Sequence, residues 1–77
     1  MVHFLIQLEV KVQGVWKEVI RYDTAHGFAH IDRFNIRGRK KKERLALSFN
    51  EALTTAERDM KQNWLTYHEQ FLEGKFP

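Results

Sequence analysis

The 77-residue sequence predicts a single α+β domain, an antiparallel β-meander of three to four strands packed by one long C-terminal helix. Two patterns predict this fold. Short runs in the first half alternate apolar and polar residues between turn-forming residues, which is typical of half-buried strands. Residues 50–73 contain no Gly or Pro and carry apolar residues at spacings of three and four, which is typical of an amphipathic helix. A chain of this length has room for one domain, 1–77, with a modest core.

The first two strands are predicted over residues 2–12 and 15–22, joined by the turn-forming pair Gln13-Gly14. A two-residue loop would place Lys17 among apolar residues. A three-residue loop would instead place apolar residues opposite one another: Val12 beside Trp16, Leu8 beside Ile20 and Ile6 beside Tyr22. We therefore predict the longer loop, with Gly14 near a bulge.

The third strand is predicted over residues 28–36, after a turn at residues 23–27 whose Asp, Thr and Gly favour chain reversal. Neither face of this strand is cleanly apolar, because both faces carry polar and charged residues. The basic segment that follows is predicted to be a loop centred on Gly38. Residues 44–48 are predicted to form a short fourth strand before the helix.

The C-terminal helix is predicted over residues 50–73. Ser48 or Asn50 is expected as its N-cap, and Glu51 has the capping-box spacing from Ser48. Gly74 suits the position just after the last turn. The stripe expected to face the sheet consists of Phe49, Leu53, Ala56, Met60, Trp64, Tyr67 and Phe71.

The predicted helix is longer than the sheet that it covers. Twenty-four helical residues span about 36 Å, whereas an eight-residue strand spans about 26 Å. We therefore expect the end of the helix to extend past the sheet, where Trp64, Phe71 and Leu72 would form an interface with a partner protein or in a homodimer.

The sequence contains no cysteine, which excludes a disulfide framework and a thiolate zinc site. No segment has the apolar length of a membrane span, and the N-terminus lacks the pattern of a signal peptide. We expect a cytoplasmic protein that contacts no membrane and needs no cofactor.

Residues 37–44, RGRKKKER, contain six of the 13 basic residues and one of the 10 acidic ones. The whole chain has a net charge of only +3, so positive charge is concentrated in this segment. Such a cluster is typical of proteins that bind an anionic partner, usually nucleic acid, although many Lys-rich segments are only solvated surface. The candidate nucleic-acid-binding residues are Arg37, Arg39, Lys40, Lys41, Lys42 and Arg44.

The densest group of chemically functional side chains lies between residues 22 and 33. Two histidines that titrate near neutral pH can act as base and acid in phosphodiester cleavage, and an arginine can hold the phosphate. This pattern predicts a metal-independent ribonuclease with His26 and His30 as the acid–base pair and Arg33 as the phosphate clamp. The candidate catalytic residues are Tyr22, Asp23, His26, His30, Asp32 and Arg33.

Two other interpretations of this segment stay open. In a structural network, Asp32 would pair with Arg21 or Arg33 across the sheet, because such networks also gather titratable groups. In the same network, His30 would pack against Tyr22. The two histidines and an aspartate are also chemically suited to a metal, but their spacing matches no specific metal signature, so no metal is predicted.

The same segment carries a family resemblance. A Trp-containing strand, an Asp-x-x-x-Gly turn and a His-x-Asp-Arg segment resemble small uncharacterised prokaryotic proteins with a meander-plus-helix fold. More distantly, the segment resembles the TumE-like toxins of type II toxin–antitoxin systems, which have a Tyr-Asp-Asn turn followed by Gly-x-x-His-x-His. The likeness to these toxins implies an RNA-directed activity and a cognate antitoxin as protein partner, and it points to Tyr22, Asp23, Gly27, His30 and Arg33. The chain departs from the toxin pattern at residue 32, where an Asp replaces the second His.

Three functions are therefore compatible with the sequence. The favoured hypothesis is a nucleic-acid-directed protein of toxin–antitoxin type with ribonuclease activity. The second is a non-catalytic module that binds nucleic acid through the basic segment. The third is a protein-interaction module that forms a homodimer through its long helix.

Overall fold

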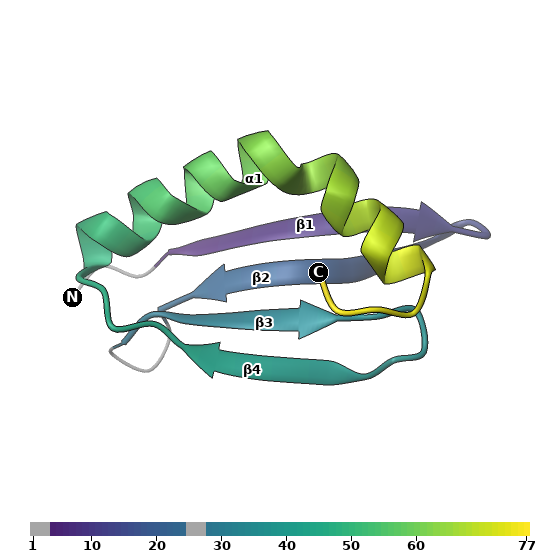
Figure 1. Ribbon diagram of the computed structural model, residues 1–77, viewed down its shortest axis with the longest axis horizontal. Helices are drawn as coiled ribbons and strands as arrows, with labels where there is room; N and C mark the ends of the chain where they lie inside the picture. The colour runs from purple at the N-terminus through teal and green to yellow at the C-terminus, as the bar shows by residue number, and fades with distance from the viewer. Residues whose placement is uncertain (1–3, 25–27) are drawn as a thin grey trace.

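The computed structural model describes residues 4–24 and 28–77 (Figure 1). It contains four antiparallel strands in the spatial order β1-β2-β3-β4, followed by one helix. The elements are β1 (Leu5–Val12), β2 (Val15–Asp23), β3 (His30–Phe34), β4 (Lys40–Arg44) and α1 (Phe49–Leu72). The predicted fold, a β-meander packed by one long C-terminal helix, is confirmed.

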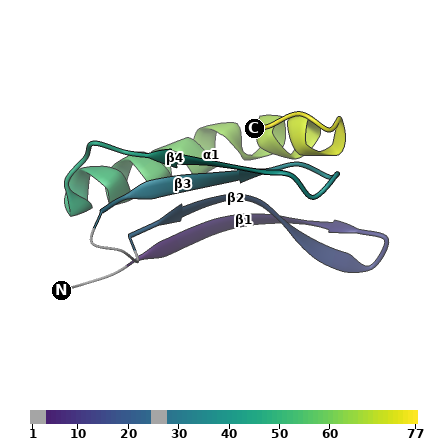
Figure 2. The ribbon, with the colours of Figure 1, turned by 90° about the horizontal axis from the view of Figure 1, so that it is seen from below.

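The helix covers one face of the sheet and leaves the other face open (Figures 1 and 2). α1 packs mainly on β1 and β2. The core between them is apolar, as the amphipathic patterns require. It consists of Ile20, Tyr22, Ile31 and Ala56, with Phe4, Ile6, Leu8, Leu45, Met60 and Tyr67 packed around them.

Strand pairing decides which side chains share each face, because paired residues point to the same side and successive residues alternate. One row across the sheet belongs to the helix-covered face: Leu8, Ile20, Arg33 and Lys41. The next row belongs to the open face: Gln7, Arg21, Asp32 and Lys42.

The β1–β2 hairpin closes through a two-residue turn. Gln13 and Gly14 have φ angles of 50° and 80°, and positive φ at both positions is the signature of a type I′ turn, whose twist matches that of the flanking strands. Val12 therefore lies opposite Val15. The predicted three-residue loop, with Val12 beside Trp16, is wrong.

A bulge in β2 reconciles this short turn with the apolar pattern. Val19 is an extra residue in β2, because Leu8 lies opposite Ile20 whereas the next residue, Glu9, lies opposite Glu18. Val19 is completely buried. The bulge shifts the register by one residue, and both remaining predicted pairs are confirmed: Leu8–Ile20 and Ile6–Tyr22.

The predicted basic loop and the predicted strand over 44–48 are both wrong, because Lys40–Arg44 is itself the edge strand β4. All of its side chains are exposed, so this strand needs no apolar residue. Charged residues also protect a sheet edge from pairing with other chains. The preceding turn is short because the Asn35 side-chain oxygen accepts hydrogen bonds from the backbone N–H groups of Arg37 and Arg39.

α1 begins and ends within one residue of its predicted bounds. The Ser48 hydroxyl accepts a hydrogen bond from the Glu51 backbone N–H, and the Glu51 carboxylate accepts one from the Ser48 backbone N–H, which completes the predicted capping box. Gly74, with φ of 80°, follows the last turn as predicted. Within the part of the chain that the structure describes, no helix has the length and apolar character needed to cross a membrane.

The far end of α1 does not extend past the sheet as expected. The β1–β2 hairpin reaches beyond the last helical turn instead (Figures 1 and 2). Phe71 is buried, and its carbonyl accepts a hydrogen bond from the backbone N–H of Ile36. Phe71 is therefore a core residue and not the interface residue that we predicted, whereas Trp64 and Leu72 are exposed.

Candidate functional site

The sheet divides the predicted catalytic residues between its two faces. Tyr22 and Arg33 lie on the helix-covered face, in the rows of the apolar core. Asp23, His30 and Asp32 lie on the open face. The predicted acid–base residue His30 and the predicted phosphate clamp Arg33 therefore project from opposite sides of β3.

Asp32 is a buried carboxylate in the open face, with 1% of its surface exposed. Arg21 Nη2 donates to Asp32 Oδ2 at 3.0 Å, and Lys40 Nζ lies 3.9 Å from the same oxygen. The pairing of Asp32 with Arg21 is what the structural interpretation predicted. A carboxylate that is covered and neutralised in this way serves to hold the strands and their cations in register.

Two aromatic rings on the open face each lie close to a cation. The guanidinium carbon of Arg44 is 4.3 Å from the ring centroid of Phe28, and Lys40 Nζ is 5.9 Å from that of Phe34. Phe28 is 37% exposed and Phe34 is half-buried. His30, which is buried, packs edge-to-face against Phe28 with 5.5 Å between ring centroids. The β3–β4 half of the open face therefore combines aromatic surface with positive charge.

The six basic residues of segment 37–44 are all exposed, but they do not share one side of the sheet. Lys41 lies on the helix-covered face, in the row of Arg33. Arg37 and Arg39 precede β4. The other three occupy alternate positions of β4 and lie on the open face: Lys40, Lys42 and Arg44. We call these three residues, together with Phe28 and Phe34, the cationic aromatic surface.

Arg33 is engaged on the helix-covered face. Its Nη1 donates to the carbonyl oxygen of Pro77 at 2.5 Å, and its Nε lies 3.4 Å from the Glu43 carboxylate. The guanidinium therefore ties the end of the chain to the sheet. The Arg33 guanidinium therefore has hydrogen-bonding and charged partners within the protein, and its position needs no bound phosphate to explain it.

A hydrogen-bonded cluster that the sequence patterns did not predict joins β2 to α1. Asp59 Oδ2 accepts a hydrogen bond from the Tyr22 hydroxyl at 2.5 Å. Asp59 Oδ1 accepts one from the Tyr67 hydroxyl and another from Asn63 Nδ2 at 2.8 Å. The signal in the sequence was the spacing of four between the three helix residues, which aligns them along one side of α1.

The environment of this cluster shifts the pKa values of its tyrosines. Two causes raise the pKa of the Tyr67 hydroxyl from 10.0 to about 12: burial, which has the larger effect, and the hydrogen bond to Asp59. The same two causes raise the pKa of Tyr22. Both phenols are therefore neutral donors at physiological pH, and their role is to satisfy the Asp59 carboxylate.

This shift predicts a specific loss of stability at alkaline pH. Because the pKa of Tyr67 is higher in the folded chain than its ordinary value of 10.0, the folded state binds the phenolic proton more tightly than the unfolded state. The stabilisation is complete below pH 10.0 and is lost as the pH rises through about 12. In urea unfolding at a series of alkaline pH values, the free energy of unfolding should fall more steeply for the wild type than for Tyr67→Phe. Equal slopes for the two proteins would contradict the proposed cause.

His26, one of the two predicted catalytic histidines, lies outside the described residues. Among the residues that are described, no group of three or more His, Cys, Asp or Glu side chains is arranged to hold a metal ion.

Comparison with known proteins identifies a family. The family described as "Domain of unknown function (DUF7718)" matches residues 1–77. No curated protein and no solved structure matches the chain. Because the family match extends from the first residue to the last, the chain belongs to the DUF7718 family.

Proposed function

We propose that the protein binds single-stranded RNA on the cationic aromatic surface of its open face. The observation that supports this proposal is the combination of exposed cations at alternate positions of β4 with aromatic rings beside them. Proteins that bind single strands use such a combination, because cations neutralise the phosphates while aromatic rings stack the unpaired bases.

The phosphates would lie along β4. Lys40, Lys42 and Arg44 project from one side of this edge strand, and all three are exposed. Neutralising phosphates releases condensed counterions, so these contacts give affinity without sequence preference and make binding weaken as salt rises. Arg44 has a second use, since a base can stack on a guanidinium plane as well as on an aromatic ring.

The bases would lie over β3. Phe28 and Phe34 are six residues apart, which is roughly 20 Å along an extended chain. This separation lets a short stretch of single strand contact both rings. In a duplex the base faces are already stacked, so the same rings would contribute little.

The proposal concerns binding and leaves cleavage aside, because His30 and Arg33 lie on opposite faces of β3. Ribonuclease activity stays a prediction from the side chains between residues 22 and 33, and the toxin-type assignment and a cognate antitoxin stay predictions from the resemblance. The homodimer stays a prediction from the exposed helix residues Trp64 and Leu72.

A stacking contribution from Phe28 can be tested with a matched control on the same chain. Phe28→Leu should weaken binding of single-stranded RNA about five- to tenfold, because stacking of one base on an aromatic ring contributes about 1–3 kcal/mol. Phe76→Leu should leave binding unchanged, since Phe76 has the same 37% exposure but lies in the C-terminal tail.

The measurement is the fluorescence anisotropy of a labelled single strand, repeated with the corresponding duplex and with DNA of the same sequence. We expect Phe28→Leu to reduce the preference for the single strand over the duplex. Wild-type binding that is absent, or equally strong for duplex and single strand, would reject the proposal.

A further inference from the structure

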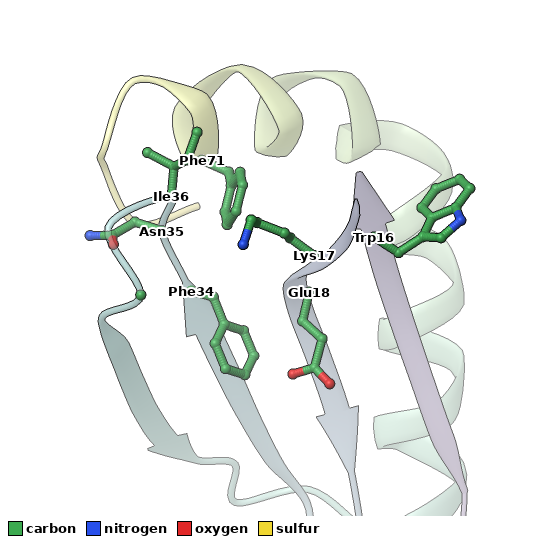
Figure 3. Close-up of a pocket in the computed structure, with 8 residues that line it drawn as sticks. Trp16, Lys17, Glu18, Phe34, Asn35, Ile36 and Phe71 are labelled. Carbon is green, nitrogen blue, oxygen red and sulfur yellow. The ribbon is translucent and has the colours of Figure 1, made fainter. Parts of the chain in front are cut away.

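A hollow lies beside the part of β2 that continues past β3, and residues from both faces of the sheet line it (Figure 3). β2 pairs with β3 only from Ile20 to Asp23, while β2 itself begins at Val15. The turn after β3 bends away from this free part of β2 and leaves an open space of about 360 Å³. Sites for small ligands commonly have volumes of roughly 300–1,000 Å³.

The inner wall of the hollow is apolar and aromatic. Phe34, Ile36 and Phe71 line it. Phe71 is fully buried and fixed by the packing of α1, and Phe34 is half-buried with Lys40 Nζ 5.9 Å from its ring centroid. A planar heterocycle can therefore stack on the Phe34 ring, next to a cation that belongs to the cationic aromatic surface.

The rim of the hollow carries an acceptor beside the Phe34 ring. The Glu18 carboxylate projects next to this ring, whereas the Lys17 ammonium points toward Phe71 (Figure 3). Lys17 pairs with Val10 and therefore belongs to the opposite face of the sheet. The only charged neighbour of Glu18 among the described ion pairs is Arg21, at 3.8 Å, and the Glu18 side chain is 40% exposed. Its oxygens therefore have acceptor capacity left for a ligand.

This arrangement discriminates between nucleobases. An ionised carboxylate only accepts hydrogen bonds, and its two oxygens accept best from two parallel N–H groups. Guanine presents such a pair on its Watson–Crick edge, N1–H and the N2 amino group. Adenine, cytosine and uracil each place an acceptor next to their Watson–Crick donor, which would face the carboxylate unpaired.

We propose that this hollow is a guanine-binding subsite, in which the base stacks on Phe34 and its Watson–Crick edge donates to Glu18. The subsite rests on the proposed function and adds a base preference to it. An RNA strand that leaves the hollow would pass Lys40 and continue along β4.

The experiment compares two strands that differ in a single base. Labelled oligouridine strands with one central guanine or one central adenine are titrated with the protein while the anisotropy of the strand is recorded. We expect the guanine strand to bind about tenfold more tightly.

The matched variants are Glu18→Gln and Glu9→Gln. The two glutamates lie opposite each other in the β1–β2 pairing, so both substitutions remove the same charge from the same place on the sheet, but only Glu18 lines the hollow. Glu18→Gln should abolish the preference for guanine, because an amide offers one acceptor and one donor. Glu9→Gln should keep the preference.

The outcomes separate the subsite from the proposed function. Equal binding of the guanine and adenine strands, with the usual salt dependence, would overturn the subsite and leave RNA binding standing. A guanine preference that survives in Glu18→Gln, or that disappears in both glutamate variants, would also overturn the subsite. If neither strand binds, both proposals fail.

Discussion

Replacing Lys40 and Lys42 with glutamine is expected to weaken binding of single-stranded RNA about 25-fold at about 0.1 M salt. Each phosphate contact to a single strand contributes about 0.7 to the slope of log affinity against log salt, so the loss of two contacts lowers the slope by about 1.4. Both lysines lie on the open face, Lys42 beside Asp32 and Lys40 beside Phe34. Anisotropy titrations at several salt concentrations measure both the affinity and the slope.

The strand itself provides the control. Lys41 lies between the two lysines in the sequence but on the helix-covered face, in the row of Arg33. Lys41→Gln should therefore leave affinity and slope almost unchanged, and so should Lys41→Gln combined with Lys61→Gln on the exposed surface of α1, which matches the loss of two charges. If the Lys41 variants weaken binding as much as the Lys40 and Lys42 pair, RNA is held by net charge and not by the open face.

Removing the Asp59 carboxylate is expected to cost about 3 kcal/mol of folding free energy. Asp59→Ala deprives the buried Tyr22 hydroxyl of its acceptor and also removes the partner of Tyr67 and Asn63. A buried donor left without a partner costs about 1–3 kcal/mol. Urea unfolding followed by circular dichroism measures the change.

Two further variants separate this mechanism from a general loss of helix packing. Glu57→Ala, at an exposed position of the same helix, should change stability by no more than about 0.5 kcal/mol. Adding Tyr22→Phe to Asp59→Ala should recover part of the loss, because the orphaned hydroxyl is removed together with its acceptor. Additive losses in the double variant would show that the hydroxyl is not the source of the cost.

The same variant links stability to function. The Asp59 cluster lies on the helix-covered face, and the cationic aromatic surface lies on the other face. The folded fraction of Asp59→Ala should therefore bind RNA as the wild type does.

Local patterns were enough to predict the fold class and the helix. The capping box of Ser48 with Glu51 and the glycine at residue 74 act on backbone groups within a few residues, so their effect can be predicted without knowing the rest of the structure. The pairing of Leu8 with Ile20 followed in the same way from apolar residues that must share one face. The two-residue hairpin turn could not be predicted in this way, because the bulge at Val19 that compensates for it depends on the whole sheet.

The candidate site was only partly predictable. The basic segment was recognised as an anion-binding candidate from its charge, but its strand character was missed, because an edge strand with exposed side chains carries no apolar alternation. Because successive side chains of a strand point to opposite faces, the sequence alone places His30 and Asp32 on one face of β3 and Arg33 on the other. The alternation does not say which face the helix covers, and therefore it does not say which face is available to a partner.

The sequence by itself therefore determined the α+β class, the bounds of α1 and the concentration of positive charge near the centre of the chain, since each depends on neighbouring residues. Only the tertiary structure decided which cations share a surface with aromatic rings. The tertiary structure also joined Tyr22 to Asp59 across 37 residues of chain and formed the open hollow that Glu18, Phe34 and Phe71 line. The physical reason is that such contacts depend on strand register and on the face to which the helix packs, and these are set by the burial of the whole core.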